Sequence, residues 1–420
     1  MKDRKLYTRF VAQRVAAALA DTPIVVLQGA RQTGKSTLAR MLASRRNNAS
    51  YLTLDDVQTL AAAKSDPQGF VQGLSGTVII DEIQRAPELL LCIKADVDRD
   101  RTPGRFLLTG SSHVLNVPQL ADAFVGRMEL VTLWPLSQCE LTRRKVDFIR
   151  ALFSDEPLKP TRRIAASPPI VEMIVIGGFP EAVARSDRGR RGAWFDAYIS
   201  TIIQREVREL ANIAGLSELP RLLSVLAARA GGLVNYADLA RDAGLNQVTL
   251  KRYSTLLNAV FLTHPVQPWF TNRIKRVMKS EKLYFVDTGI LAHLQAIDET
   301  DLKRDTRAKG ALFENFVLGE LLKQLGWSNV RAQIHHFRSY SGEEVDFVLE
   351  TPGQRKIVGI EIKASATVQA SDFDGLKSLR AIIGNTFHRG VVLYAGDTLV
   401  PFAPDLFAVP IHYLWTAVAA

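Results

Sequence analysis

The pattern of apolar and polar positions changes along the chain. In the first third, short apolar segments alternate with helical patterns, and these segments lie at residues 24–27, 51–54, 78–80, 106–108 and 128–133. Such alternation is typical of a parallel β-sheet covered by helices. We therefore predict an α/β domain with a parallel sheet at residues 1–145.

The middle of the chain follows a different pattern. Residues 146–192 lose the periodicity and carry several prolines, which is typical of a linker or lid-like segment. Residues 193–300 show long helical periodicity, followed by two short strand patterns at 263–266 and 283–286. Helices that precede a small hairpin predict a helical region of the winged-helix kind.

The last part of the chain returns to a mixed pattern. At residues 301–420 one amphipathic helix, 308–325, precedes strand patterns at 334–338, 345–349, 357–362 and 391–394. This region predicts a second α/β domain.

Composition narrows the class of protein. The 420 residues, 47% hydrophobic and 23% charged, predict about three domains at roughly 150 residues each. The formal net charge of +10 suits a polyanionic partner but does not require one. Cys92 and Cys139 form no CxxC pair, so we expect no disulfide framework, no zinc finger and a cytoplasmic location. No apolar run approaches the roughly 20 residues of a membrane-spanning helix, so we expect no signal peptide and no membrane contact.

A phosphate-binding motif stands between the first strand pattern and the helix that follows it. The segment GARQTGKS, residues 29–36, satisfies the spacing GxxxxGK[ST]. Its glycines let backbone amides face an anion, Lys35 can reach the outer phosphates, and Ser36 can ligate Mg²⁺. The alternative is a chance glycine-rich turn. The residues expected to contact the nucleotide are Gly29, Ala30, Arg31, Gln32, Thr33, Gly34, Lys35, Ser36 and Thr37.

Two further strand ends carry polar groups suited to the same site. TVIIDE ends in Asp81, placed to hold the magnesium shell, and Glu82, placed to polarise a water for attack on the γ-phosphate. Alternatively, these two carboxylates face only solvent. RFLLTGSS ends in hydroxyls that could orient that water or sense the γ-phosphate, namely Thr109, Ser111 and Ser112. Arg127 could add a positive charge near the γ-phosphate, or it is an ordinary surface arginine.

Residues 236–259 have the length of a helix-turn-helix pair with a glycine in the turn. Three apolar residues are expected to pack inward, while Lys251 and Arg252 project outward; the three are Val248, Leu256 and Leu257. From residue 241 to residue 282 there are eight Lys and Arg against two acids, an excess suited to phosphate contacts. The expected DNA-contacting residues are Lys251, Arg252, Arg273, Lys275, Arg276 and Lys279. The alternative is a winged helix used only for packing, because no base-reading set of side chains is evident.

Near the carboxyl end of the chain, the two-residue period of strand side chains places two carboxylates on one face of a predicted hairpin. If Gly353 and Gln354 form a two-residue hairpin turn, paired residue numbers sum to 707 and Asp346 lies opposite Glu361. If the turn centres on Pro352 and Gly353, the sum is 705 and the two carboxylates are diagonal neighbours on one face.

Lys363 points to the same face, because strand side chains repeat every two residues. Two carboxylates and a lysine can hold Mg²⁺ and steady a hydroxide, as phosphodiester hydrolysis needs. Glu314, in the preceding helix, could complete the metal shell. The alternative makes Glu361 and Lys363 an exposed strand pair, with Asp346 capping a turn. His335 and His336 would point to opposite faces of a strand, so we expect them to be structural.

These motifs resemble a known family, the AAA-type ATPases of bacteria and archaea whose second half carries a domain of unknown function. The resemblance rests on GARQTGKS, IIDEIQRAP (79–87), LLTGSS (107–112), GRMELVTLWPLS (126–137) and GGFPE (177–181). It implies an ATPase core with an additional strand, a Walker B role for Asp81 and Glu82, and a sensor at 109–112. It also implies that Arg127 acts as a finger across a subunit interface.

A second resemblance concerns residues 308–395. Glu314, Asp346, Glu361 and Lys363 fill the helix-glutamate, aspartate and ExK pattern of the restriction-endonuclease-like nucleases. It implies a fold of that kind at 301–420, and leaves open whether the site cleaves DNA.

Together these patterns predict an ATP- and Mg²⁺-dependent, homo-oligomeric ATPase that acts on DNA. The alternative from another class is a nucleotide-dependent switch or scaffold, including a defence or antitoxin-like regulator, whose carboxyl-terminal domain only binds a nucleic acid or a protein partner.

Overall fold

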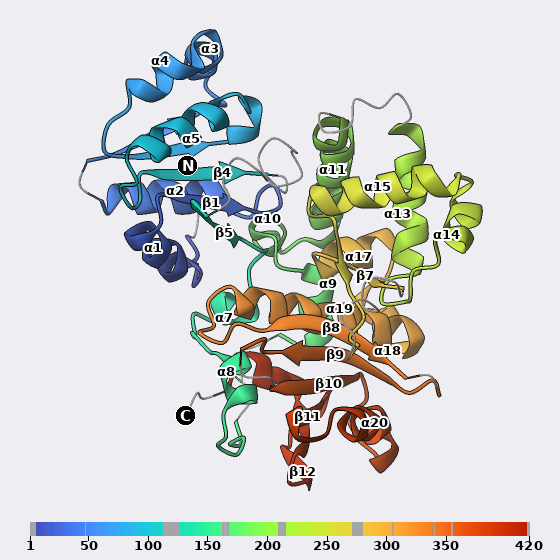
Figure 1. The fold of residues 1–420 in the computed structure, drawn as a ribbon. Coiled ribbons are helices and arrows are strands. Elements are labelled where there is room, and N and C mark those ends of the chain that lie inside the picture. The colour runs from blue at the N-terminus through green and yellow to red at the C-terminus, as the bar shows by residue number, and fades with distance from the viewer. Residues whose placement is uncertain are drawn as a thin grey trace. The chain divides into compact units, whose positions relative to one another are not determined.

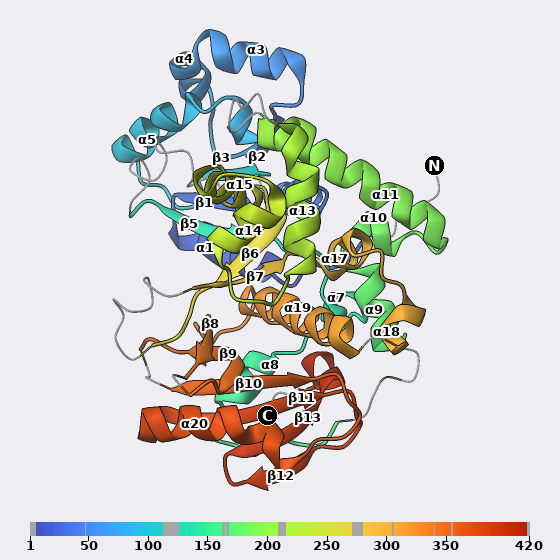
Figure 2. The same ribbon diagram turned by 90° about the vertical axis from the view of Figure 1, so that its right-hand side faces the viewer.

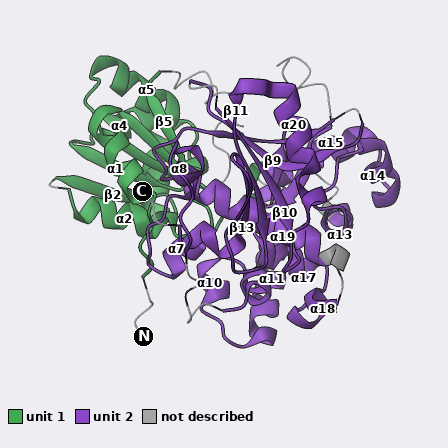
Figure 3. Ribbon diagram, turned by 90° about the horizontal axis from the view of Figure 1, so that it is seen from below, with its two compact units in different colours: residues 1–135, 259–261 green, residues 136–258, 262–420 purple. Residues whose placement is uncertain are grey.

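A computed structural model provides the fold (Figure 1). It describes residues 6–46, 48–111, 126–161, 164, 168–208, 216–270, 280–304, 306–339, 341–353 and 356–417. The chain divides into two compact units (Figure 3). The first consists of residues 1–135 with 259–261, and the second of residues 136–258 with 262–420.

The first unit is built on a five-stranded parallel sheet in the order β2-β3-β4-β1-β5. Its strands are β1 (Ile24–Gln28), β2 (Ala49–Thr53), β3 (Thr77–Asp81), β4 (Phe106–Gly110) and β5 (Met128–Thr132). All five lie where the apolar segments predict them. Because β4 lies between β1 and β3, the sheet has the additional strand that the family resemblance implies.

Both faces of this sheet are covered, which explains why the central strands β1 and β4 are buried at every position. Val25 and Leu27 of β1 face a core shared with α1 (Ala12–Asp21) and α2 (Lys35–Ser44). Ile24 and Val26 face a second core. The helices that contribute to that second core are α3 (Val57–Ser65), α4 (Pro67–Gln72) and α5 (Leu89–Arg99). In open α/β sheets, ligands bind beyond the carboxyl ends of the strands, so this edge of the sheet is where a binding site is expected.

The second unit begins with helices. They are α7 (Gln138–Leu141), α8 (Phe148–Phe153), α9 (Ile170–Ile176), α10 (Pro180–Val183), α11 (Arg188–Thr201), α13 (Leu219–Ala228), α14 (Tyr236–Ala243) and α15 (Gln247–Ala259). The stretch expected to be a linker, 146–192, therefore contains helices. Phe148, Ile149 and Leu152 of α8 are fully buried, so this part of the chain packs into a core.

A two-stranded antiparallel sheet follows, formed by β6 (Thr263–Val266) and β7 (Lys282–Phe285). Three helices come next: α17 (Thr288–Leu294), α18 (Glu299–Arg304) and α19 (Thr306–Leu325). The expected strand patterns at 263–266 and 283–286 and the expected helix at 308–325 are confirmed.

The carboxyl-terminal sheet has six strands in the order β12-β13-β11-β10-β9-β8. They are β8 (Gln333–Arg338), β9 (Glu344–Glu350), β10 (Ile357–Lys363), β11 (Phe387–Tyr394), β12 (Val400–Ala403) and β13 (Leu406–Pro410). Figure 2 shows α19 and α20 (Asp374–Ile383) on opposite faces of this sheet. Ile357 pairs with Glu350 and Ile360 with Phe347, so the register that sums to 707 is confirmed.

Among the described residues, no helix combines the length and the apolar character needed to cross a lipid bilayer.

Candidate functional site

The phosphate loop, residues 29–36, joins the carboxyl end of β1 to the first turn of α2. A Cβ on Gly29 would lie 2.2 Å from the carbonyl oxygen of Leu133, and Gly29 has a φ of 149°. Gly34 has a φ of 97°, a left-handed conformation that strains other residues. The two glycines therefore allow the backbone path that turns amides toward an anion.

Lys35 is buried inside this loop, with 4% of its surface exposed. Its Nζ donates to the carbonyl oxygens of Gly29 at 2.8 Å and Ala30 at 2.9 Å. Both acceptors are neutral, and phosphate oxygens bind an ammonium more strongly than carbonyls do. The loop thus holds a cation on partners that an anion can replace.

Arg9 braces the same loop, and the motif search did not predict it. Its guanidinium donates to the carbonyl of Thr33 at 2.6 Å and to that of Trp134 at 2.5 Å. The Thr33 hydroxyl in turn donates to the carbonyl of Ala30 at 2.8 Å. Arg9 precedes α1 and lies outside the motif, so no spacing rule could have linked it to the loop.

Asp81 lies at the carboxyl end of β3, with a hydroxyl donor on each carboxylate oxygen. Tyr51 donates to Oδ2 at 2.6 Å, and the hydroxyl of Thr109 donates to Oδ1. Burial, followed by Asp81 itself, raises the pKa of Tyr51 to about 12, so the phenol stays protonated and keeps donating. These contacts fix the orientation of Asp81 at the sheet edge.

Glu82 follows with a φ of 60°, an uncommon left-handed conformation for a residue other than glycine. Its Oε2 accepts a hydrogen bond from Gln84 at 2.5 Å, and Gln84 also donates to Ser111 Oγ at 3.0 Å. Burial raises the pKa of Glu82, and the charge of Lys35 opposes this shift. A carboxylate with raised proton affinity suits a general base.

The structure therefore brings most of the predicted nucleotide residues to one edge of the sheet. The loop follows β1, Asp81 and Glu82 end β3, and Thr109 and Ser111 end β4, which lies between those two strands. Ser36 and Thr37 lie in the first turn of α2. Ser112 lies outside the described residues.

Arg127 is not part of this group within one chain. Its carbonyl accepts from the backbone amide of Ile24, the first residue of β1, at 3.2 Å. That position is at the amino edge of the sheet, opposite the phosphate loop. The guanidinium pairs with Asp98 at 2.5 Å.

In the helical region, α14 and α15 are joined through Gly244, which has a φ of 69°. Lys251 and Arg252 are exposed, as expected, and Lys251 lies 5.2 Å from the ring centroid of Tyr236. Val248, expected to pack inward, is 79% exposed, because the buried face of α15 is formed by Leu250, Tyr253 and Leu257. The other expected DNA-contacting residues, Arg273, Lys275, Arg276 and Lys279, lie outside the described residues.

The three predicted carboxylates of the carboxyl-terminal domain do gather, and we call Glu314, Asp346 and Glu361 the carboxylate cluster. They come from α19, β9 and β10 respectively. Oδ2 of Asp346 accepts from the backbone amide of Ile362 at 2.9 Å. Lys363 lies 3.0 Å from Glu361 and 3.7 Å from Asp372, so the ExK lysine is also at the cluster.

Two residues of β7 that sequence reasoning missed also belong here. Nζ of Lys282 lies 3.0 Å from Glu314 and 3.6 Å from Asp346, and the hydroxyl of Tyr284 donates to Glu314. Lys282 and Tyr284 share one face of a strand by parity. The available signal was a lysine directly before the apolar strand pattern predicted at 283–286.

Burial dominates the electrostatics of the cluster. It raises the pKa of Glu314 to about 7 and that of Glu361 to about 8, and it also raises the pKa of Asp346. Asp346 adds to the shifts of Glu314 and Glu361, while Lys282 opposes that of Glu314 and Lys363 that of Glu361. Burial acts to lower the pKa of Lys282, but Glu314 and Asp346 raise it overall.

The side chains of the carboxylate cluster are of the chemical type that binds a divalent cation. Oε2 of Glu361 is buried without a hydrogen-bond partner, and three carboxylates supply the oxygens that Mg²⁺ or Mn²⁺ prefers. Within the described residues, however, no group of three or more His, Cys, Asp or Glu side chains is arranged to hold a metal ion. Lys282 supplies positive charge between two of the carboxylates instead.

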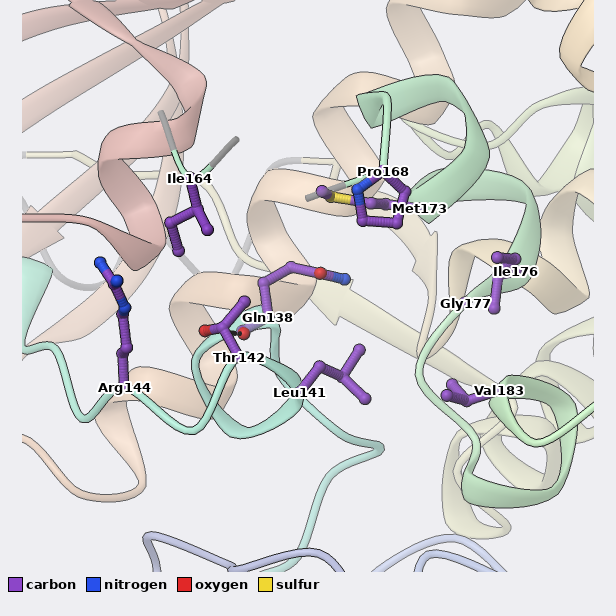
Figure 4. Close-up of a pocket in the computed structure, with 10 residues that line it drawn as sticks. All are labelled: Gln138, Leu141, Thr142, Arg144, Ile164, Pro168, Met173, Ile176, Gly177 and Val183. Atoms are coloured by element: carbon purple, nitrogen blue, oxygen red, sulfur yellow. Dashed lines mark hydrogen bonds between the residues drawn. The ribbon is translucent and has the colours of Figure 1, made fainter. Parts of the chain in front are cut away.

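A separate cavity of about 490 Å³ lies among α7, α9 and α10 of the second unit (Figure 4). Leu141, Met173, Ile176 and Val183 give it an apolar lining, and Arg144 adds a cation. None of the predicted site residues lines this cavity.

Three families match consecutive parts of the chain. An AAA domain matches residues 21–142. A domain of unknown function, DUF8612, matches residues 168–301, and a second, DUF4143, matches residues 309–414. The first unit is thus an AAA-type, ATPase-like domain. The carboxylate cluster lies within DUF4143, and β7, which supplies Lys282 and Tyr284, lies within DUF8612.

Whole-chain relatives and solved structures add further similarities. The chain is 30% identical over 410 residues to "Uncharacterized protein Mb2031c" of Mycobacterium bovis and to "Uncharacterized protein Rv2008c" of Mycobacterium tuberculosis. Each alignment covers 97% of this chain and 84% of the relative.

Among solved structures, a RuvB variant of Thermotoga maritima is 22% identical, with a TM-score of 0.29, over 60% of this chain and 88% of RuvB. AMPPCP-bound DnaA of Aquifex aeolicus is 14% identical, with a TM-score of 0.29, over 59% of this chain and 86% of DnaA. These scores are too low to inform the function. The full-length identity to the two mycobacterial proteins decides the family: the chain belongs with them, and its residues 21–142 are an AAA domain.

Proposed function

We propose that the protein binds and hydrolyses ATP with Mg²⁺ at the phosphate loop. The observation that carries this proposal is a buried Lys35 that donates to two loop carbonyls, at the same sheet edge as Asp81 and Glu82. Lys35 would bind the outer phosphates in exchange for the carbonyls. Ser36 and Asp81 would hold Mg²⁺, which neutralises charge on the phosphates when bound. Glu82, with its raised pKa, would polarise the attacking water.

Gln84 supports a sensing role for the hydroxyls at the end of β4. It donates to both Glu82 and Ser111, and Thr109 accepts from the backbone amide of Glu82 at 3.2 Å. A change at the γ-phosphate would therefore reach β4 through Glu82. Arg127 would serve the site of a neighbouring subunit in a homo-oligomer, because its position at the opposite sheet edge keeps it from its own.

We further propose that the nucleotide state controls engagement of DNA. The formal charge of +10 and the exposed Lys251 and Arg252 on α15 support a DNA partner. The division into 1–145, 146–192, 193–300 and 301–420 stays our proposal for the domains, with a winged-helix element in the third and a cytoplasmic location for the whole.

At the carboxylate cluster we propose metal-dependent cleavage of DNA. The gathering of Glu314, Asp346, Glu361 and Lys363 supports it. The carboxylates would hold Mg²⁺, and Lys363 would steady the attacking hydroxide.

A second candidate, a nucleotide-dependent switch or scaffold without nuclease activity, is favoured by Lys282. Its ammonium already pairs with two of the three carboxylates, so the cluster has a counter-charge without a metal. In that case the carboxyl-terminal domain would bind a nucleic acid or a protein rather than cut.

Replacing Lys35 tests the ATPase proposal. We expect Lys35→Ala to lower ATP turnover by at least about 10²-fold, because a positive charge aimed at the transferred phosphoryl group is lost. Phosphate release at saturating ATP is the measurement. Lys64→Ala, an exposed lysine on α3 of the same domain, is the control and should keep full turnover. Turnover by Lys35→Ala equal to that of the wild type would end the assignment of the loop.

A cleavage assay separates the two candidates for the carboxyl-terminal domain. Duplex, forked and single-stranded DNA are incubated with Mg²⁺ or Mn²⁺, with and without ATP. The nuclease proposal expects cuts that Glu361→Ala and Lys363→Ala abolish, whereas Lys377→Ala, which removes an exposed lysine of α20, leaves them unchanged. No cut on any DNA supports the switch.

A further inference from the structure

Lys282 is a buried cation brought to the carboxylate cluster from another part of the chain. It belongs to β7, in the region that matches DUF8612, while the three carboxylates belong to DUF4143. Its side chain is 7% exposed, and its Nζ lies 3.0 Å from Glu314 and 3.6 Å from Asp346. The ammonium therefore stands where a cation shared by these two carboxylates would stand.

The backbone that carries Lys282 is fixed on both sides. In β6, Val266 pairs with Lys282, and on the other side Leu233 forms a bridge to Lys282. The amide of Gly231 donates to the carbonyl of Leu283 at 2.8 Å. The backbone cannot shift without breaking this pairing, so the freedom of Lys282 lies in its flexible four-carbon side chain.

The carboxylates leave little room for a second cation beside this ammonium. Oε1 of Glu314 already accepts from both Lys282 and Tyr284. Asp346 uses Oδ2 for the amide of Ile362 and faces Lys282 with Oδ1. A divalent ion on the same oxygens would lie within a few ångströms of the ammonium, where like charges in a buried site repel strongly.

We propose that Lys282 is an intramolecular competitor of the divalent cation at the carboxylate cluster. While its ammonium pairs with Glu314 and Asp346, the site is closed to Mg²⁺ or Mn²⁺, and a metal enters only when the lysine side chain leaves. This inference rests on the proposed cation site but not on DNA cleavage. The contact is inhibitory and links two separately recognised regions of one chain.

Metal binding by the full-length protein tests it, with Mn²⁺ alone as the probe. Calorimetry and electron paramagnetic resonance count bound Mn²⁺ without nucleotide, so no activity is needed. A site that is open for only a fraction of the time binds more weakly by that fraction. We therefore expect Lys282→Met to bind one Mn²⁺ at least about tenfold more tightly than the wild type. Lys282→Arg keeps the charge and should behave as the wild type does.

Two further variants show where the additional Mn²⁺ binds and whether the gain in affinity is specific to Lys282. Adding Glu314→Gln to Lys282→Met should abolish the gain, which places the bound Mn²⁺ at the cluster. Lys377→Met removes an exposed lysine of the same unit and should leave Mn²⁺ binding unchanged. If Lys282→Met does not fold, Lys282→Gln removes the charge but can still donate a hydrogen bond to Glu314.

The wild type supplies a measurement that needs no variant. Acetylation by an amine-reactive reagent, read by peptide mass spectrometry, should label Lys282 slowly without metal and faster at high Mn²⁺. Equal Mn²⁺ affinity in wild type and Lys282→Met, or labelling that Mn²⁺ leaves unchanged, overturns the proposal.

The outcome is separable from the nuclease proposal. Tighter Mn²⁺ binding by Lys282→Met without any DNA cleavage supports the competitor and removes the nuclease. If the wild type cleaves DNA with a metal and Lys282→Met has the same Mn²⁺ affinity as the wild type, the nuclease proposal is supported and the competitor proposal is removed.

Discussion

The phosphate loop and the carboxylate cluster each contain a buried lysine, and the two lysines differ in their partners. Lys35 donates to two backbone carbonyls, at 2.8 and 2.9 Å. Lys282 lies 3.0 and 3.6 Å from two carboxylates, Glu314 and Asp346. The two acceptors of Lys35 are neutral, and its charge acts on Glu82, whereas Lys282 pairs directly with two carboxylates. A buried lysine therefore indicates a ligand site only when its partners are weaker than the ligand.

The two sites also differ in completeness. Every element of the carboxylate cluster comes from the second unit of one chain. The loop site has Lys35, Asp81 and Glu82 at one edge of a sheet, but Arg127 lies at the other edge. If the proposed assembly is correct, one site needs a second subunit and the other does not.

The largest expected effect tests that difference. Arg127→Ala should lower ATP hydrolysis by about 10³-fold while leaving ATP affinity intact, because an arginine finger stabilises charge in the transition state. Hydrolysis and nucleotide binding are measured separately, the latter with a fluorescent analogue. Mixing Arg127→Ala with Lys35→Ala should restore part of the activity, since mixed interfaces pair an intact loop with an intact Arg127.

Asp98→Ala is the matched control, because Asp98 pairs with Arg127 in the same subunit. Breaking that pair without removing the arginine should change hydrolysis little. Mixing that restores no activity would remove the shared site, and the loop would then be complete in one chain.

The next effect concerns stability. Lys282→Met should lower the free energy of unfolding of the second unit by about 3 to 5 kcal/mol, because it leaves a buried carboxylate without its partner. Glu314→Gln should also destabilise, and the double variant should lose less than the sum of the two. Urea denaturation followed by tryptophan fluorescence is suitable, since four of the five tryptophans belong to this unit.

Lys35→Met is the matched comparison in the first unit. It removes an ammonium from two neutral acceptors, so we expect the unfolding free energy to fall by about 1 to 2 kcal/mol, less than for Lys282→Met. A loss as large as that for Lys282→Met would contradict the distinction between the two lysines.

The two regions also differ in what sequence could predict. The phosphate loop is one local segment of fixed spacing, so its glycines, lysine and flanking strand and helix followed from the motif. That Asp346 and Glu361 share one face followed from the two-residue period of strands, whereas the structure was needed to choose between the direct and the diagonal register. Both arguments use geometry that is fixed within a few residues or one hairpin.

Non-local contacts were beyond reach for the same reason. Arg9 meets the loop from a segment ahead of α1, and Lys282 meets Glu314 across 32 residues. The two-residue period of a strand places Lys282 and Tyr284 on one face, but it does not show which helix packs against that face.

Some local predictions also failed. Val248 was wrongly placed inside because helical periodicity alone did not fix which face of α15 is buried. Strand β12 was not predicted, since it is short and has mostly exposed residues, and the apolar strand β13 was also missed.

The smallest effect concerns pH and the neighbourhood of Lys282. His336 is 2% exposed, and its Nε2 lies 3.2 Å from the carbonyl oxygen of Ser280. Burial, with a further contribution from the charge of Lys282, lowers the pKa of His336 to about 4 from 6.5. The folded protein therefore resists protonation that the unfolded chain accepts. Stability from this group is full above about pH 6.5 and is lost as the pH falls toward 4.

We expect the second unit to lose up to about 3 kcal/mol of unfolding free energy over this range through His336, given about 1.4 kcal/mol per pKa unit. Urea denaturation at pH 7 and pH 4.5, compared between wild type and His336→Gln, isolates the contribution. The variant should show the smaller loss on acidification. In Lys282→Met the pKa of His336 should lie closer to 6.5, because the charge that lowers it most is removed while burial remains, and the acid-induced loss should shrink accordingly. An identical loss in wild type and His336→Gln would mean that the ring takes up its proton equally in the folded and unfolded chains.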